Sequence, residues 1–233
     1  MIHQLIFANP KPGMEVLDFQ NYWLNIHAVK YASKIPQIVR YRINKVRTID
    51  DEKPLFNGVG EIWLRNEAEQ LESLQSKEFL QGARIDEPNW AAFWETIALD
   101  TTAVEIKEHH HLDQQVIKLV LLVKRKEGTP LELFRYYSGN SHSKLVCDFF
   151  RVIGYTQCYT VDAAYHNGEP RFDAVYQLWF ENSDSLQSTL QSNYYKNELL
   201  TDLDKFVEMK YFFKLICEEH WIIGPEYRSY HNA

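Results

Sequence analysis

The sequence lacks the marks of several large protein classes. Its three cysteines (Cys147, Cys158 and Cys217) are an odd number without metal-ligand spacing, which argues against a disulfide framework and favours a reducing compartment. No apolar run approaches the roughly 18–20 residues that a membrane helix needs, and the start does not resemble a signal peptide. We therefore expect a cytoplasmic protein with no membrane partner.

Positive charge and familiar catalytic motifs are also scarce. The formal net charge is −7, and no basic stripe suits a nucleic-acid backbone, so we expect no nucleic-acid partner. The patterns GxSxG and GxGxxG and the phosphate-binding loop are absent. The adjacent residues His109, His110 and His111 lack the spacing of metal ligands, so no metal site is predicted there.

What is present is an ordinary globular composition with many aromatic side chains. The 233 residues are 45% hydrophobic and 24% charged, enough for one large domain or two small ones. Aromatic residues make up 14%, and such side chains either pack a core or line pockets for flat organic ligands. Composition alone leaves both interpretations open.

The chain repeats itself. FQNYWLNIHA at 19–28 matches FRYYSGNSHS at 134–143 without a gap, and GEIWLRN at 60–66 matches VYQLWFEN at 175–182. DEPNWAAF at 86–93 aligns with DLDKFVEM at 202–209 at nearly the same offset. A constant offset over a whole unit indicates an internal duplication, with one unit at 1–108 and the other at 114–233.

Each unit shows the same order of expected elements. Strands are predicted at 3–9, 37–46 and through Trp63 in the first unit, and at 116–124, 154–165 and through Trp179 in the second. Helices are predicted at 14–35, where Pro36 ends the helix, and at 130–150, with Thr129 as N-cap and Pro130 in the first turn. Second helices begin near the caps Asn66 and Asn182, and HNGEP at 166–170 predicts a hairpin through Asn167-Gly168.

This order is β-α-β-β-α-β, the split unit of ferredoxin-like folds. The expected fold class is α+β, with two such units packed sheet to sheet as an intramolecular barrel. The strand VIKLVLLVK at 116–124 is apolar at both parities, so we expect it to be buried on both faces.

The first unit resembles the EthD family of the dimeric α+β barrel superfamily. The resemblance rests on the pattern F-x-x-Y-W-x-x-x-H-A followed by I-P and R-Y, which here is formed by Phe19, Tyr22, Trp23, His27, Ala28, Ile35, Pro36, Arg40 and Tyr41. It is good over residues 1–106 and weaker over 115–223, where Ser138 replaces Trp23 and Ser143 replaces Ala28. Any surviving site is therefore expected mainly in residues 1–106.

The resemblance implies small-molecule chemistry in or beside the barrel. The leading expectation is a cofactor-independent lyase or cyclase that transfers a proton on a hydrophobic, polyketide-like or aromatic substrate, or a cofactor-free monooxygenase. A binding or auxiliary protein without catalysis is the alternative, and a haem protein is a further one. Fold alone does not choose among them, and association of two chains into a homodimer stays open.

His27 is the expected general acid or base, because an unperturbed histidine titrates near pH 6.5. In α-helical geometry it shares a face with Trp23 and Tyr31, whereas Tyr22 lies about 140° away at about 100° per residue. The alternative role for His27 is structural, with its ring bonded to a backbone carbonyl.

The remaining candidates assist that histidine. Tyr41 is expected to hydrogen-bond the substrate oxygen, with Trp23 and Trp63 as apolar walls. Tyr22 and its counterpart Tyr137, together with His142, are substrate-binding candidates in the two units. Core packing is the alternative explanation for Tyr22, Tyr137, Tyr41 and Trp63, and His142 is either active or retained only for packing.

Overall fold

The structure is a computed structural model of the chain, and it describes residues 1–48, 53–108, 116–149 and 151–229. Two compact units are formed, one by residues 1–101 with 219–233 and the other by 102–218. The chain passes from one unit to the other within strands β4 and β8, whose bounds are given below. His109, His110 and His111 lie outside the described residues.

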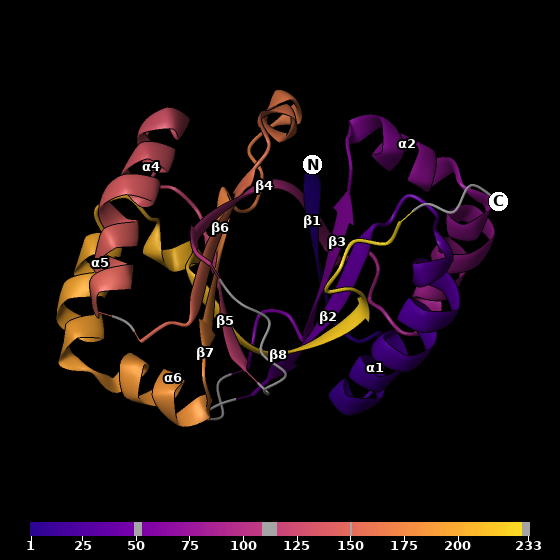
Figure 1. Cartoon of the computed structure of the whole chain (residues 1–233), viewed down its shortest axis with the longest axis horizontal. Helices are drawn as coiled ribbons and strands as arrows, with labels where there is room; N and C mark the ends of the chain where they lie inside the picture. The colour runs from indigo at the N-terminus through magenta and orange to yellow at the C-terminus, as the bar shows by residue number, and fades with distance from the viewer. Residues whose placement is uncertain (49–52, 109–115, 150, 230–233) are drawn as a thin grey trace. The chain divides into compact units, whose positions relative to one another are not determined.

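In the first unit, an antiparallel sheet has the strand order β4-β1-β3-β2. The strands are β1 (Ile2–Ala8), β2 (Arg40–Arg47), β3 (Gly58–Leu64) and β4 (Ile97–Lys107). The helical segments are α1 (Val16–Tyr22), the π-helical η1 (Trp23–Tyr31), η2 (Ala32–Lys34), α2 (Glu67–Gln75), the π-helical η3 (Phe79–Ala83), α3 (Arg84–Asp86) and η4 (Glu87–Asn89). Helices α1 and α2 lie on the same side of the sheet (Figure 1).

The second unit has the same order of elements, and its antiparallel sheet runs β8-β5-β7-β6. Its strands are β5 (Ile117–Val123), β6 (Gly154–Thr160), β7 (Ala174–Phe180) and β8 (Phe213–Ile223). Its helical segments are α4 (Leu131–Tyr137), the π-helical η5 (Ser138–His142), α5 (Ser143–Phe149), η6 (Asp162–Asn167), α6 (Ser183–Gln191), the π-helical η7 (Tyr195–Leu199), α7 (Leu200–Leu203) and η8 (Met209–Tyr211).

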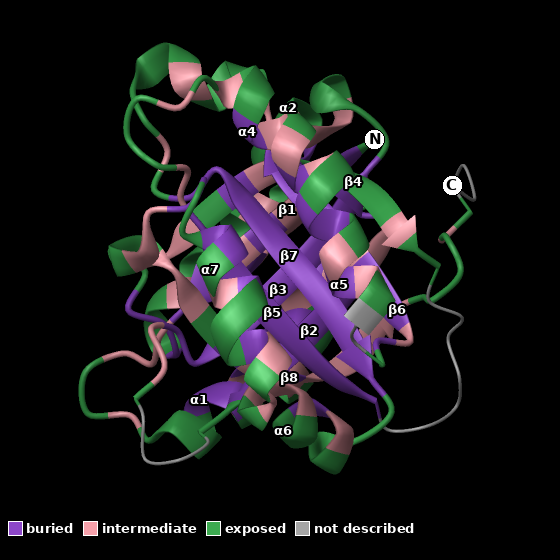
Figure 2. Cartoon of the chain, turned by 90° about the vertical axis from the view of Figure 1, so that its left-hand side faces the viewer, coloured by how far each residue is buried: buried purple, intermediate pink, exposed green. Residues whose placement is uncertain are grey.

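Several local predictions are confirmed. Every residue of β5 is buried, as its apolar pattern at both parities predicts, and β7 is likewise buried throughout (Figure 2). Asn66 and Asn182 cap the second helices, since their side chains accept hydrogen bonds from the backbone N–H groups of Glu69 at 2.9 Å and Ser185 at 2.8 Å. These caps fix where each second helix leaves the sheet.

One local prediction is wrong and another is confirmed only in part. Pro130, not Thr129, is the N-cap of α4, and it makes no side-chain cap bond because proline has no polar side chain. Strands β6 and β7 are antiparallel neighbours, but Asn167-Gly168 does not form a two-residue turn. Residues Asp162–Asn167 instead form a 3₁₀ segment, and Gly168 alone takes the positive φ, at 138°.

The fold is thus a mixed α and β fold, with an antiparallel sheet and helices in each unit. The finer arrangement, two ferredoxin-like units packed sheet to sheet, stays a prediction. Over the ranges that the structure describes, no helix has the length and apolar character required to cross a membrane.

The strand registers define equivalent positions in the two units. His3 pairs with Trp63 between β1 and β3, and Lys118 pairs with Trp179 between β5 and β7. Tyr41 of β2 is opposite Ile62, as Tyr155 of β6 is opposite Leu178. Each side chain of the first unit can therefore be compared with its counterpart in the second.

Candidate active site

A carboxylate joins the signature tyrosine and histidine of the first unit. Asp86, at the end of α3, accepts a hydrogen bond from Tyr22 on Oδ1 at 2.9 Å, and its Oδ2 lies 2.9 Å from Nδ1 of His27. Asn89 donates a third hydrogen bond to Oδ1 at 3.1 Å. Asp86 and His27 are both buried, so this Tyr22–Asp86–His27 triad is a shielded arrangement.

The triad forms because the signature helix is not a regular α-helix. From Trp23 to Tyr31 the backbone is π-helical, with hydrogen bonds that reach one residue further along the chain. Residues five positions apart, such as Tyr22 and His27, therefore come to the same side and share Asp86. The prediction that Tyr22 lies nearly opposite His27 is wrong, because it assumed α-helical geometry.

The electrostatics keep His27 neutral and oriented. Burial lowers the pKa of His27 below its ordinary value of 6.5, although the hydrogen bond and charge of Asp86 oppose this shift. Since an ionised carboxylate only accepts hydrogen bonds, Asp86 selects the tautomer with the proton on Nδ1. Nε2 has no hydrogen-bond partner within the described ranges, and it is left unprotonated, as a general base must be.

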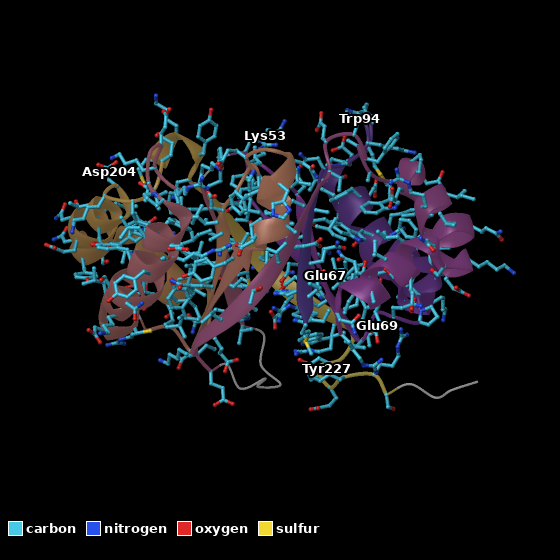
Figure 3. All side chains as sticks on the ribbon, turned by 90° about the horizontal axis from the view of Figure 1, so that it is seen from above. Lys53, Glu67, Glu69, Trp94, Asp204 and Tyr227 are labelled. Carbon is cyan, nitrogen blue, oxygen red and sulfur yellow. The ribbon has the colours of Figure 1, made fainter. Side chains whose placement is uncertain are left out.

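A cavity of about 440 Å³ lies in the first unit against this histidine. His27, Trp23 and Tyr41 all line it, together with apolar side chains of the helices and of strand β3. The lining residues Leu74 and Phe93 are 45% and 44% exposed, so the cavity has an apolar margin at the protein surface. Trp94, which follows Phe93, projects outward from this unit (Figure 3).

Tyr41 is a buried hydrogen-bond donor in the cavity wall. Its hydroxyl accepts a hydrogen bond from the indole N–H of Trp23 at 3.2 Å. Burial raises the pKa of Tyr41, so the hydroxyl keeps its proton. None of the described residues accepts that proton, which leaves it free to be donated to a ligand oxygen.

The cavity wall contains a second donor that the sequence analysis did not select. The indole ring of Trp90 lies 4.7 Å from the ring of His27 between centroids, and its Nε1 is buried without a hydrogen-bond partner among the described residues. Buried polar groups normally have a partner, so an orphaned N–H in a cavity wall calls for one. Phe206 is the equivalent residue in the second unit, where no donor needs to be satisfied.

Room for the large Trp23 side chain comes from glycine on the facing strand. A Cβ added at Gly60 would lie 2.9 Å from Cζ2 of Trp23, and one at Gly58 would lie 2.7 Å from its Cζ3. The second unit makes the opposite choice, since Ser138 replaces Trp23 and Tyr176 replaces Gly60. The hydroxyls of Ser138 and Tyr176 lie 2.5 Å apart, so the large side chain there comes from the strand.

The triad itself recurs in the second unit with the same geometry. Tyr137 donates to Oδ1 of Asp202 at 2.7 Å, and Nδ1 of His142 lies 2.9 Å from Oδ2. Lys205 replaces Asn89 and donates to Oδ1 at 3.0 Å. Burial would raise the pKa of Asp202, but the hydrogen bonds from His142, Tyr137 and Lys205 outweigh it and lower the pKa well below its usual range.

The surroundings of the two triads differ in polarity. Around the cavity of the first unit stand the polar side chains of Gln4, Gln70, Arg84, Glu87 and Asp100. Their equivalents in the second unit are all aliphatic: Leu119, Leu186, Leu200, Leu203 and Ile216. These five belong to, or pack against, the hydrophobic core of the second unit, so apolar side chains occupy that region.

The structure thus places the sequence-predicted residues in three locations. His27, Tyr41 and Trp23 line the cavity, and Tyr22 supports His27 through Asp86. Trp63 is not among the lining residues, because its neighbours Ile62 and Leu64 occupy the cavity face and strand side chains alternate. Trp63 instead stacks on His3, with ring centroids 4.3 Å apart. Tyr137 and His142 form the second triad.

The sequence analysis missed the carboxylates Asp86 and Asp202 as site residues. A signal was present, because the two aspartates occupy the same place in the repeat. No group of three or more histidine, cysteine or acidic side chains suited to a metal ion is found in the described ranges.

Comparison with known proteins finds one family model that matches part of the chain. The EthD domain family model matches residues 126–210, in the second half, although the sequence signature is fuller in the first. No curated protein matches the sequence.

Solved structures match over nearly the whole chain. An anthrone oxidase-like protein is similar with a TM-score of 0.64 at 7% identity, covering 97% of this chain and 93% of that one. A candidate monooxygenase from Fusobacterium nucleatum subsp. nucleatum gives 0.59 at 9%, covering 100% and 98%. A mutant chlorite dismutase from Candidatus Nitrospira defluvii gives 0.52 at 7%, covering 94% and 91%. Identities this low show the fold alone. Residues 126–210 thus match the EthD domain family, and the chain shares the fold of these solved structures.

Proposed function

We propose that the first unit is a cofactor-independent enzyme that transfers a proton on a hydrophobic small molecule. The observation that carries the proposal is the buried His27, which is bonded to Asp86 through Nδ1 and lines a cavity with no partner for Nε2 among the described residues. The structural alternative had the ring bonded to a backbone carbonyl, whereas the acceptor at Nδ1 is the carboxylate of Asp86.

The chain's own residues suffice for the step. Nε2 of His27 would take a proton from a carbon next to a carbonyl group, and Asp86 would stabilise the imidazolium that forms. The hydroxyl of Tyr41 would hydrogen-bond the oxygen on which negative charge develops, and the orphaned N–H of Trp90 is a second donor in the same wall. A positioned base contributes about 10²–10⁴-fold and one donor to a developing oxyanion about 10²–10³-fold.

The shape and lining of the cavity support a flat, largely apolar substrate. A volume of about 440 Å³ is within the range of small-molecule sites, and aromatic rings form much of the wall. The anthrone oxidase-like protein of similar fold, whose name refers to a flat aromatic ketone, supports this choice. Cyclisation, dehydration and cofactor-free monooxygenation of such compounds can all begin with the same deprotonation.

The experiment measures that deprotonation directly. Anthrone, a carbon acid with a flat aromatic frame, is incubated with the protein in D₂O, and loss of its acidic C–H signal is followed by NMR. The wild type should accelerate exchange, His27→Gln should abolish the acceleration, and His142→Gln should leave it unchanged. The two variants are matched, because each removes a histidine from a triad of the same geometry.

Three other outcomes would refute the proposal. Binding of anthrone without accelerated exchange would favour the non-catalytic binding protein, and accelerated exchange that survives His27→Gln would show that His27 is not the base. A Soret band after addition of haem, lost in His27→Gln, would favour the haem alternative, since His27 is the cavity-lining histidine whose free Nε2 could ligate iron.

A further inference from the structure

A polar cluster stands in the wall of the same cavity, and the proton-transfer step does not use it. Gln4 on β1 and Asp100 on β4 are opposite one another in the strand register, and Gln70 reaches them from α2. Both glutamine amides donate to one atom, Oδ1 of Asp100, each at 2.8 Å. All three side chains line the cavity.

This arrangement leaves acceptor atoms without partners. A carboxylate accepts only, so it turns both amide NH₂ groups toward itself and their carbonyl oxygens away. Oδ2 of Asp100 and the side-chain oxygens of Gln4 and Gln70 make no hydrogen bond within the described residues. The cluster therefore presents a fixed set of acceptors that carries one negative charge.

The second unit shows that the fold does not need this cluster. At the equivalent positions stand Leu119, Leu186 and Ile216, which belong to or pack against the hydrophobic core. The same sheet and helix accept three aliphatic side chains there. The free acceptor atoms belong to side chains that line the cavity, and their equivalents in the second unit are aliphatic, so their presence in the cavity unit alone points to a ligand.

We propose that Gln4, Gln70 and Asp100 form a recognition subsite for a hydrogen-bond donor group of the ligand, either a hydroxyl or a protonated amine. The inference rests on the proposed function, because it concerns the compound that His27 deprotonates, and it narrows that compound to one carrying such a donor. The glutamines hold the carboxylate in place, and Oδ2 accepts the ligand's proton.

The test uses three probes that share one flat ring system and differ in the donor. These are 2-naphthol, 2-methoxynaphthalene, which cannot donate, and 2-naphthylmethylamine, which is protonated at neutral pH. Their affinities are measured by calorimetry for the wild type and for Asp100→Ile and Gln70→Leu, which carry aliphatic residues as the second unit does. His27→Gln is the control for a donor bound at the histidine instead.

We expect the wild type to bind 2-naphthol about 10- to 100-fold more tightly than 2-methoxynaphthalene, as a hydrogen bond to a charged acceptor allows. Asp100→Ile should remove this preference and keep the affinity for 2-methoxynaphthalene, and His27→Gln should keep the preference. If Asp100→Ile does not fold, Gln70→Leu, on the outer helix, should still reduce the preference by about threefold or more. The amine shows which donor is preferred, according to whether it or 2-naphthol binds more tightly.

A wild type without preference, or a preference that survives Asp100→Ile, would overturn the subsite. A preference lost only in His27→Gln would overturn it too, because the hydroxyl would then sit on the histidine. These results are separate from carbon-acid exchange. If exchange is lost in His27→Gln but the preference for 2-naphthol survives Asp100→Ile, the subsite alone is refuted. If exchange survives His27→Gln but the preference is lost in Asp100→Ile, the catalytic proposal alone is refuted.

Discussion

Asp86→Asn is the change that tests the proposed site most sharply, because it alters the charge and tautomer of the triad with almost no change in shape. The Oδ1 side of Asp86 receives two donors, Tyr22 and Asn89, at 2.9 and 3.1 Å. An asparagine will therefore place its carbonyl oxygen on that side and its NH₂ group toward Nδ1 of His27. The imidazole must then accept at Nδ1 and carry its proton on Nε2, which removes the base.

The expected loss follows from that reversal. With Nε2 protonated and no carboxylate to stabilise an imidazolium, we expect deprotonation to slow by about 10²–10⁴-fold, the contribution of a positioned general base. Stability should fall by about 1–1.5 kcal/mol, since a hydrogen bond to a charged group (about 1.5–3 kcal/mol) is replaced by a neutral one (about 0.5–1.5 kcal/mol). Exchange of the anthrone C–H in D₂O measures the first quantity and urea denaturation the second.

Asp202→Asn provides the matched control. It makes the same change in the second triad and should also lower stability, but exchange should stay at the wild-type rate because aliphatic side chains replace the polar cavity lining there. The ¹⁵N shifts of the imidazole of His27 report the tautomer directly. The reasoning fails if the tautomer switches in Asp86→Asn while exchange stays within about threefold of wild type, or if Asp202→Asn slows exchange equally.

Three further predictions concern the groups around His27. Tyr41→Phe should slow anthrone exchange by about 10²–10³-fold. It should also lower the free energy of unfolding in urea by about 1–3 kcal/mol, because the indole N–H of Trp23 loses its acceptor. Unchanged exchange would remove Tyr41 from the mechanism. Trp90→Phe, which copies Phe206, breaks no protein hydrogen bond and should lower stability only through the packing lost with the smaller buried ring, yet weaken anthrone binding; unaltered binding would show that the orphaned N–H serves no ligand. Because the pKa of His27 is lowered on folding, the exchange rate should fall with a midpoint below pH 6.5, and the free energy of unfolding should also decrease as pH drops through that pKa. In His27→Gln the free energy of unfolding should depend less on pH below 6.5. A midpoint of the exchange rate above pH 6.5 would contradict a buried, neutral imidazole.

Much of the local structure could be predicted because it depends on short-range patterns. Apolar residues at both parities of β5 predicted a strand buried throughout, and Asn66 and Asn182 predicted helix starts through capping. The prediction of Thr129 as a cap failed because Pro130 takes that position, and the predicted hairpin forms between β6 and β7 with a 3₁₀ segment at Asp162–Asn167 in its connection. The start of a helix and the conformation of a strand connection depend on the tertiary contacts of the flanking residues, and not on the cap or turn residues alone.

The candidate site could be predicted only in part. The signature identified His27, Trp23 and Tyr41, and all three line one cavity. Trp63 was grouped with them, but the alternation of side chains along β3 turns it to the other face. The sequence alone does not show which face of the strand the helices cover. Trp90 was seen only as a partner of Phe206 in the repeat, since nothing local shows that its N–H lacks an acceptor.

The sequence by itself determined the elements, their order and the two aromatic–histidine helices, because periodicity, capping and chain repetition act over a few residues at a time. Only the tertiary structure showed that Tyr22 and His27 share a side, since the backbone there is π-helical and not α-helical as the sequence indicated. It also brought Asp86 to His27 across a long stretch of chain. Only the tertiary structure showed, finally, that polar side chains line a cavity in one unit, while their aliphatic equivalents belong to or pack against the hydrophobic core in the other.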